Sequence, residues 1–255
     1  NLFHLLGGAM SQHPMVPVLK AWLSSAARHQ DAVRAAQAAA EAIANDPWAV
    51  VQQAGTLART QLTYAQQDMG LTVDLKTKEP HQKSVVVTVP KGAPFPCWDT
   101  RGRRTRGAFD TPKTMAHQTV KAALDAAQIP TCQGLDPACG TGAFLLALHE
   151  AGVDSILGFE LDARAAAVAR VAVPGATILV GDGFELPGTA DVIVGNPPFV
   201  PPERQNKRMR ADLKKRFPWL RGRFDLSVPF AVSAVERAHR GGGIGLVLPA
   251  SLMVQ

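Results

Sequence analysis

The sequence predicts an α/β fold: a parallel, Rossmann-like sheet with helices on both faces, preceded by an N-terminal helical segment. From residue 131 onward, short apolar runs alternate with stretches of helical periodicity. We expect strands at residues 133–136, 155–160, 177–182, 190–196 and 244–249, and helices at 142–151, 163–171 and 225–240. Strands that alternate with helices indicate βαβ units. Ligands of such sheets bind beyond the carboxyl ends of the strands, so the residues there are candidate functional residues.

The first hundred residues are expected to form a separate, mainly helical segment, with the α/β domain covering residues 101–255. Apolar residues recur at helical spacing from Val18, and an Ala-rich stretch continues to Ala44. Asp46-Pro47 is typical of a helix start, and we expect that second helix to continue to about Asp68. Residues 84–89 are the expected strand. No chemistry is evident here, so packing or docking is the expected role.

Composition narrows the classes of protein only modestly. The chain has 255 residues and a net charge of +6, which weakly favours polyanionic partners. The three cysteines form no CxxC pair or Cys/His cluster, so we expect no zinc, no disulfides and a reducing cytoplasm. No apolar run reaches the roughly 18–20 residues that a membrane span needs. The chain starts without Met, which suggests a fragment or a processed protein.

The loop after the first expected strand is a candidate ligand-binding loop. It begins at Asp136 and contains Ala138, Gly140 and Gly142. Glycines let a ligand approach the backbone and let the chain turn sharply into a helix. Alone this is a weak signal, because an ordinary turn uses the same residues.

Acidic residues end the next two expected strands. Glu160 follows Gly140 by twenty residues, a spacing at which a carboxylate suits a ribose diol. Asp182 could accept a hydrogen bond from an adenine amino group while Phe184 stacks on the ring; taken alone, Asp182 could instead cap a helix, but acids at three successive strand ends favour the ligand. The loop lacks a third glycine, which disfavours a dinucleotide. A rim formed by Asp136, Glu160 and Asp182 better suits a nucleoside with a positive group, such as S-adenosylmethionine.

The fourth expected strand ends in the most specific motif of the chain, Asn196-Pro197-Pro198-Phe199. The prolines remove two donors and stiffen the backbone. The Asn196 side-chain oxygen and the Pro197 carbonyl can then hold both hydrogens of a planar amino group, with Phe199 stacked on its ring. An adenine in duplex DNA would have to be flipped out to reach this motif.

The order and spacing of these motifs resemble the gamma class of N6-adenine DNA methyltransferases, found in restriction–modification systems and related phage defence. The residues that match are 136–144 for the cofactor loop, 158–162 for the ribose motif and 196–199 for the catalytic motif. The resemblance also includes residues 107–112, 222–226 and 241–252, and covers roughly residues 101–255. At position 110 the family often has Tyr, where this chain has Asp.

The resemblance implies a function and its partners. S-adenosylmethionine would donate a methyl group to adenine N6 of a flipped base in double-stranded DNA, without a metal or a covalent enzyme intermediate. Thr111 would fold over the methionine end of the cofactor. The family's sheet and target-recognition domain continue beyond the equivalent of Gln255. We therefore expect a truncated chain, inactive alone, that works with a restriction or specificity subunit or domain.

A basic stretch follows the catalytic motif directly. Residues 204–223 contain nine Lys and Arg against a single acid, Asp212. In this fold the stretch would face the DNA backbone and neutralise phosphates without reading sequence. The candidate phosphate-binding residues are Arg204, Lys207, Arg208, Arg210, Lys214 and Lys215. A second basic cluster, at residues 101–106, directly precedes the matched segment 107–112, which we call the Thr-Pro motif because it ends in Thr111-Pro112. Either cluster could instead be a solvated face.

Two alternatives stay open. Enzymes that methylate a glutamine of peptide-release factors, and some ribosomal RNA methyltransferases, share the Asn-Pro-Pro-aromatic motif, so RNA or a protein glutamine is the alternative substrate. The upstream Thr-Pro motif, the Pro-Ala-Cys of the cofactor loop and the basic stretch favour DNA. The other alternative is a degenerate methyltransferase that only binds DNA or a partner.

Overall fold

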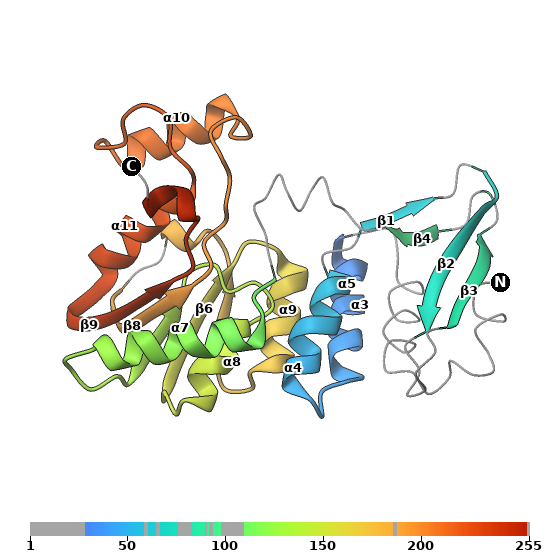
Figure 1. Ribbon diagram of the computed structural model, residues 1–255, viewed down its shortest axis with the longest axis horizontal. Coiled ribbons are helices and arrows are strands. Elements are labelled where there is room, and N and C mark those ends of the chain that lie inside the picture. The colour runs from blue at the N-terminus through green and yellow to red at the C-terminus, as the bar shows by residue number, and fades with distance from the viewer. Residues whose placement is uncertain are drawn as a thin grey trace.

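A five-stranded parallel sheet is the centre of the molecule (Figure 1). The structure, a computed structural model, describes residues 29–58, 61–64, 67–75, 83–89, 91, 94–97, 110–185 and 188–253. The strands are β5 (Gln133–Asp136), β6 (Ser155–Glu160), β7 (Thr177–Val180), β8 (Ala190–Gly195) and β9 (Ala238–Leu246), in the order β7-β6-β5-β8-β9. The strand order reverses between β5 and β8, and ligands of such sheets bind in the crevice at that point.

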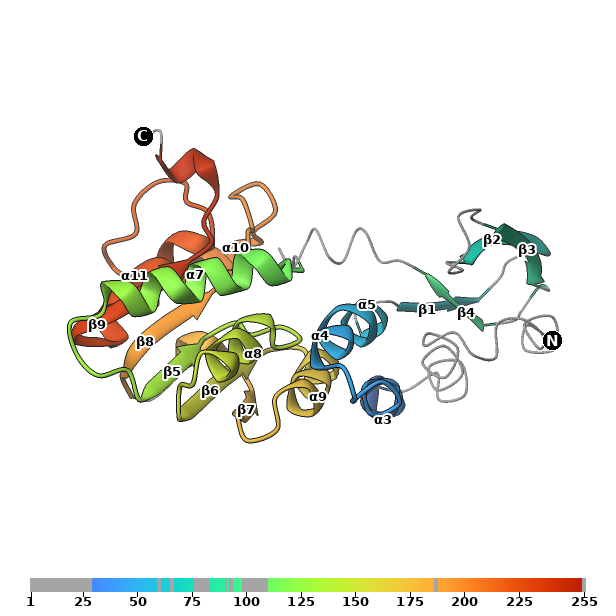
Figure 2. The ribbon, with the colours of Figure 1, turned by 60° about the horizontal axis from the view of Figure 1, so that its bottom comes forward.

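Helices cover both faces of the sheet, as predicted (Figure 2). On one side lie α7 (Lys113–Ala126), α8 (Ala143–Glu150) and α9 (Ala163–Ala172), and on the other lies α11 (Ser227–Arg237). Successive side chains of a strand point to opposite faces. Val192 and Val194 of β8 accordingly pack in the core with α7, α8 and α9, whereas Ile193 packs with Ala234 of α11. Burial on both faces explains the uninterrupted apolar run of this strand.

The last helix and strand differ from the prediction in their bounds. Helix α11 ends at Arg237, and β9 begins at Ala238 rather than at Ile244. The start of β9 contains a run of glycines, which in a sequence indicates a loop. In the structure a Cβ on Gly243 would lie 1.9 Å from the Ala123 carbonyl oxygen of α7. The glycines therefore allow the strand to pack directly against a helix.

The N-terminal helices share the hydrophobic core of the sheet. They are α3 (His29–Glu41), α4 (Pro47–Ala49), the π-helix η1 (Val50–Ala54) and α5 (Gly55–Ala58). Ala36, Ala40 and Trp48 are buried in one cluster with residues of α8 and α9. The helix start at Asp46 is confirmed, because its carboxylate accepts hydrogen bonds from the amides of Trp48 and Ala49. The expected continuation to Asp68 is wrong.

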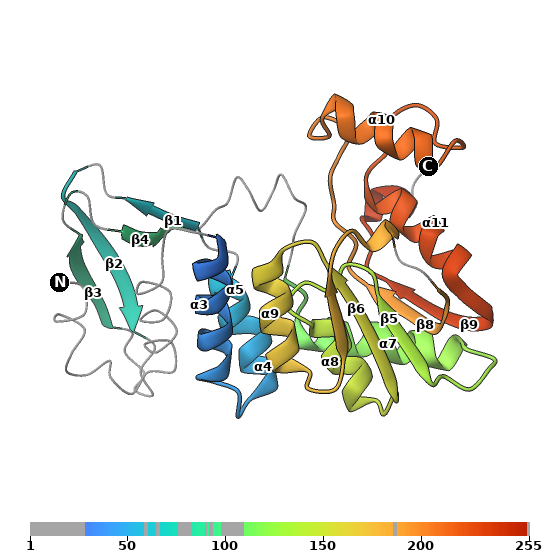
Figure 3. The same cartoon turned by 180° about the vertical axis from the view of Figure 1, so that it is seen from behind.

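Strands replace the rest of that expected helix. Strand β1 (Gln61–Tyr64) pairs antiparallel with β4 (Pro94–Cys97), and β2 (Met69–Leu75) pairs antiparallel with β3 (Lys83–Val89), as Figure 3 shows from behind. The strand expected at residues 84–89 is confirmed, and residues 61–64 form a strand where a helix was expected. The first 28 residues, the basic cluster at 101–106 and the start of the Thr-Pro motif at 107–109 lie outside the described residues.

Residues 200–226, which we call the cap, lie beyond the carboxyl ends of the strands and carry α10 (Lys207–Arg216) (Figure 1). The cap has its own, largely aromatic core: Phe184, Val200, Leu213, Phe217, Leu220, Phe224, Leu226 and Phe230. Buried Gln205 donates hydrogen bonds to the carbonyls of Val200 and Phe224, which joins the two ends of the cap. Two short 3-10 helices, η2 (Gly183–Glu185) and η3 (Ala250–Met253), complete the described elements.

Candidate active site

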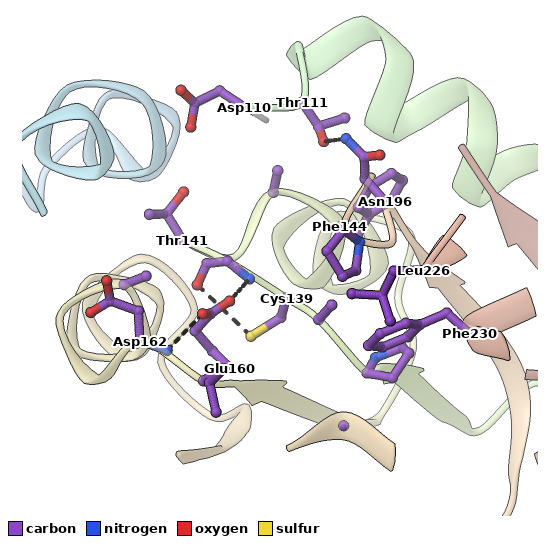
Figure 4. Close-up of a pocket in the computed structure, with 18 of the residues that line it drawn as sticks. Asp110, Thr111, Cys139, Thr141, Phe144, Glu160, Asp162, Asn196, Leu226 and Phe230 are labelled. Atoms are coloured by element: carbon purple, nitrogen blue, oxygen red, sulfur yellow. Dashed lines mark hydrogen bonds between the residues drawn. The ribbon is translucent and has the colours of Figure 1, made fainter. Parts of the chain in front are cut away.

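A cavity of about 550 Å³ lies at the carboxyl edge of the sheet, within the size range of small-molecule sites (Figure 4). Its walls come from the residues that follow β5, β6, β7 and β8, from the N-terminal helices and from the cap. The predicted residues that line it are Thr111, Ala138, Gly140, Glu160, Asp182, Asn196, Pro198 and Arg204. The structure thus brings together residues from four different strand ends.

Asn196 follows β8 and carries an unsatisfied acceptor. Its amide nitrogen donates a 3.2 Å hydrogen bond to the Thr111 hydroxyl, which precedes α7 (Figure 4). Its side-chain oxygen is buried and has no hydrogen-bond partner among the described residues. Buried polar atoms are almost always paired, so an orphaned carbonyl oxygen at a cavity wall suits a ligand that donates a hydrogen bond.

Glu160 ends β6 and is held by two backbone amides. One carboxylate oxygen accepts from the Gly140 amide at 2.8 Å, and the other accepts from the Asp162 amide at 2.8 Å. Gly140 reaches this position with a φ of 58°, in the left-handed region that favours glycine. The Glu160 side chain is therefore fixed at the cavity wall.

Asp182 lies at the same rim, after β7. Its carboxylate accepts a 3.0 Å hydrogen bond from the Phe184 amide and lines the cavity. Between Glu160 and Asp182 in sequence, Leu161 also lines the cavity and is 74 % exposed. An exposed leucine between two carboxylates offers an apolar surface for a flat ring next to acceptors for its polar edge.

Asp136 lies beneath the cavity and does not line it. It is 1 % exposed; one oxygen accepts from the Ala138 amide at 2.9 Å, and the other has no partner among the described residues. Burial raises the pKa of this carboxyl to about 8; the Ala138 amide opposes the shift and the charge of Glu160 adds to it. A Cβ on Gly195 would lie 2.8 Å from Asp136 Oδ1, so β8 approaches this carboxyl only because it has glycine there.

Several predicted site residues lie outside the cavity wall. Phe184 is buried in the cap core, with ring centroids 4.1 Å from Phe230 and 5.3 Å from Phe217, so its ring is already in contact with other rings. Gly142 opens α8, and a Cβ there would lie 3.2 Å from that of Ala169 in α9, so it serves helix packing. Pro197 and Phe199 do not line the cavity either.

The predicted phosphate-binding residues belong to the cap. Arg204 is exposed and also lines the cavity, beside Asn206 and Met209. Most of the other predicted residues lie exposed on α10, whose only described ion pair is a 3.9 Å contact between Arg208 and Asp212. The basic surface therefore starts at the cavity and continues along the cap.

Three sets of wall residues were not predicted. The N-terminal helices contribute Val51 and Gln52, although the sequence indicated no chemistry there. Phe144, Leu226 and Phe230 form apolar wall (Figure 4). Asp110 and Thr141, both in matched motifs, line it as well. Of these three sets, only Asp110 and Thr141 could have been found from the sequence, because they belong to matched motifs. Helical periodicity does not reveal which helix packs at a strand edge.

Within the described residues, no three His, Cys, Asp or Glu side chains are grouped to hold a metal ion. No helix in that part of the chain is long and apolar enough to span a membrane.

The fold is similar to those of solved methyltransferases. One match is a protein described as a class I S-adenosylmethionine-dependent methyltransferase from Listeria monocytogenes, with 20 % identity, a TM-score of 0.48, and coverage of 57 % of this chain and 48 % of that one. Another is the methyltransferase subunit of a type I restriction-modification system from Streptococcus thermophilus, with 19 % identity, a TM-score of 0.43, and coverage of 56 % and 35 %. The chain matches less than half the length of each.

A family comparison concerns the part of the chain that contains the Asn196 motif. Residues 155–255 match the family of Eco57I restriction-modification methylases. These residues include Glu160, Asp182, Asn196 and the whole cap. S-adenosylmethionine as cofactor agrees with this match. The resemblance to restriction–modification methyltransferases is thus confirmed over residues 155–255.

Proposed function

We propose that this chain is the catalytic part of an S-adenosylmethionine-dependent DNA methyltransferase that acts on adenine N6. The observation that carries the proposal is the buried side-chain oxygen of Asn196, which has no partner among the residues that the structure describes and lies at the wall of a cavity rimmed by Glu160 and Asp182. The rim suits a nucleoside, and the orphaned oxygen suits an amino group brought next to it. Both features belong to the sequence that matches a methylase family.

The rim residues give the cofactor a specific fit. Glu160 would accept the ribose hydroxyls, because its carboxylate is oriented by the amides of Gly140 and Asp162. Asp182 would accept from the adenine amino group, with Leu161 against the ring. The negative charges of both carboxylates favour a cationic ligand. The chemistry that S-adenosylmethionine supplies when bound is an electrophilic methyl group on a sulfonium.

Asn196 would hold the reacting amine. Thr111 fixes the amide nitrogen of Asn196, which would leave its oxygen to accept an amine hydrogen. The amine nitrogen is a poor nucleophile, since its lone pair is shared with the ring. That acceptor would orient the lone pair towards the methyl group of the bound cofactor and stabilise the positive charge that develops on nitrogen. Transfer would join the methyl carbon to the amine nitrogen and break its bond to sulfur, and the extra amine proton would leave to solvent.

DNA is the substrate that the cap supports best. Its exposed Lys and Arg residues would neutralise phosphates next to the cavity. A target adenine would reach Asn196 by flipping out of the duplex, and the apolar wall of Phe144, Leu226 and Phe230 would receive the ring. Recognition of a particular sequence would come from a specificity or restriction subunit or domain. RNA or a protein glutamine is the alternative substrate.

Replacement of Asn196 tests the proposal. Asn196→Ala should reduce methyl transfer to adenine in double-stranded DNA by at least about 100-fold, the effect of removing a transition-state hydrogen bond. Affinity for S-adenosylhomocysteine, measured by calorimetry, should not change. The matched control is Asn45→Ala, in an exposed turn, with transfer as in the wild type. Normal transfer by Asn196→Ala, or transfer to RNA or a glutamine peptide in place of DNA, would contradict the proposal.

A further inference from the structure

We infer that the N-terminal π-helix η1 is part of the cofactor site, and that the Gln52 side chain binds the amino-acid end of S-adenosylmethionine. This inference rests on the proposed function. Val51 and Gln52 line the same cavity as Glu160 and Asn196, more than a hundred residues later in the sequence. The helices at residues 47–58 would then do more than cover the sheet.

A buried hydrogen bond holds η1 against the cofactor loop. The Thr141 hydroxyl donates to the Val51 carbonyl at 3.1 Å. The π-helical turn makes this contact possible: the Gly55 amide bonds to the carbonyls of Val50 and Gln52 and leaves Val51 out. π-Helical turns are frequent at functional sites. Here the turn orients one backbone carbonyl towards the loop between β5 and α8, and it brings the next residue, Gln52, to the cavity wall.

Close packing keeps that arrangement fixed. A Cβ on Gly55 would lie 2.9 Å from the Thr141 methyl carbon and 3.0 Å from its hydroxyl oxygen. Only glycine therefore allows α5 to come this near to the loop. On the other side of the segment, the Trp48 indole donates a 2.8 Å hydrogen bond to Glu150 at the end of α8. Contacts at both ends thus position Gln52 relative to the strand edge.

The chemistry of the neighbouring wall suits a zwitterion. Gln52 has an exposed amide that can donate to a carboxylate and accept from an ammonium group. Asp110, an exposed carboxylate, lines the same cavity (Figure 4). The acceptors for ribose and adenine, Glu160 and Asp182, come from other strand ends. An amino-acid group is the part of S-adenosylmethionine for which both the amide and the carboxylate would be complementary.

Two ligands that differ only at that end test the inference. S-adenosylhomocysteine carries the amino-acid group, whereas 5′-methylthioadenosine has the same nucleoside without it. Gln52→Ala should weaken binding of S-adenosylhomocysteine about ten-fold, the loss expected for a hydrogen bond to a charged group. Binding of 5′-methylthioadenosine should change less than about two-fold, on the same scale. Calorimetry on the whole 255-residue chain measures both affinities.

The matched control is Gln37→Ala, an exposed glutamine of α3 that bonds only to Glu41 in the same helix. Both affinities should stay as in the wild type.

Hydrogen exchange gives a second measurement: S-adenosylhomocysteine should slow exchange of the backbone amides in residues 47–58, and 5′-methylthioadenosine should not. An unchanged affinity of Gln52→Ala for S-adenosylhomocysteine, or equal losses for the two ligands, would overturn the inference alone. A wild-type chain that binds neither ligand would overturn the proposed function as well.

Discussion

Asp136 and Asp191 occupy neighbouring strands, β5 and β8, and have opposite surroundings. Asp136, at the carboxyl edge of the sheet, is buried, one of its carboxylate oxygens has no partner within the described part of the chain, and burial raises its pKa to about 8. Asp191, near the other edge, accepts hydrogen bonds from the amides of Cys132 and Gln133, at 3.0 and 2.9 Å, and contacts His239 at 2.8 Å. His239 and these amides lower its pKa.

This comparison distinguishes the end of the sheet whose polar groups stabilise the fold from the end whose polar groups could bind a ligand. Asp191 joins the starts of β5, β8 and β9, and its hydrogen-bonding capacity is used within the protein. At the opposite edge, Asp136 and Asn196 each keep a buried oxygen without a partner among the described residues. Unpaired buried acceptors cost stability. The unpaired acceptors at the carboxyl edge therefore indicate a role other than stability.

The largest effect on stability is expected for Asp191, at the edge of the sheet where the carboxylate is hydrogen-bonded within the protein. Asp191→Ala removes the acceptor for two backbone amides and His239, and should lower the free energy of unfolding by about 2 kcal/mol, from roughly 1 kcal/mol per hydrogen bond with partial hydration of the freed groups. Urea denaturation measures the loss, and affinity for S-adenosylhomocysteine should not change. The control is Asp154→Ala, an exposed aspartate just before β6. Equal stability of the two variants would contradict this role of Asp191.

An effect of opposite sign that depends on pH is expected for Asp136→Asn. Because burial raises the pKa of this carboxyl in the folded chain to about 8 from its ordinary value of 3.8, the folded chain retains a proton that the unfolded chain loses between these values. The stability that this group contributes is present below pH 4 and lost as pH rises towards 8. Asparagine keeps the acceptor for the Ala138 amide and carries no charge.

Asp136→Asn should therefore be more stable than the wild type at pH 8, and the difference should be smaller at pH 5. Urea denaturation at the two pH values measures it. For Asp191 the lowered pKa gives the reverse dependence: its contribution is present above pH 4 and lost as pH falls further. A gain from Asp136→Asn that is equal at both pH values would disprove the assigned burial cost.

The smallest effect on stability is expected for charges that face solvent on the cap. The triple variant Lys207→Ala, Lys214→Ala and Lys215→Ala changes exposed residues of α10, so stability should stay within about 0.5 kcal/mol of the wild type. DNA affinity should fall, and the slope of log affinity against log salt concentration should flatten by about one for each phosphate that is no longer neutralised. An unchanged slope would remove these lysines from the proposed DNA surface.

Local patterns in the sequence determined the strands and the site motifs. The bounds of β5 and β6 are as predicted, because short apolar runs between turn residues have few other solutions in a buried sheet. Glu160, Asp182 and Asn196 were identified at strand ends, and the parallel order of the sheet brings all three to one cavity.

Contacts between distant segments decided the rest. The ring of Phe184 lies in the cap core because Phe217 and Phe230 fold back onto it, and Gln52 reaches the cavity because Thr141 bonds to Val51, ninety residues away. The glycines at the start of β9 form a strand because α7 packs against them. Hydrophobic periodicity is local, whereas packing between distant elements depends on shape. The tertiary structure alone therefore determined that the Phe184 ring is enclosed and that the N-terminal helices line the cavity.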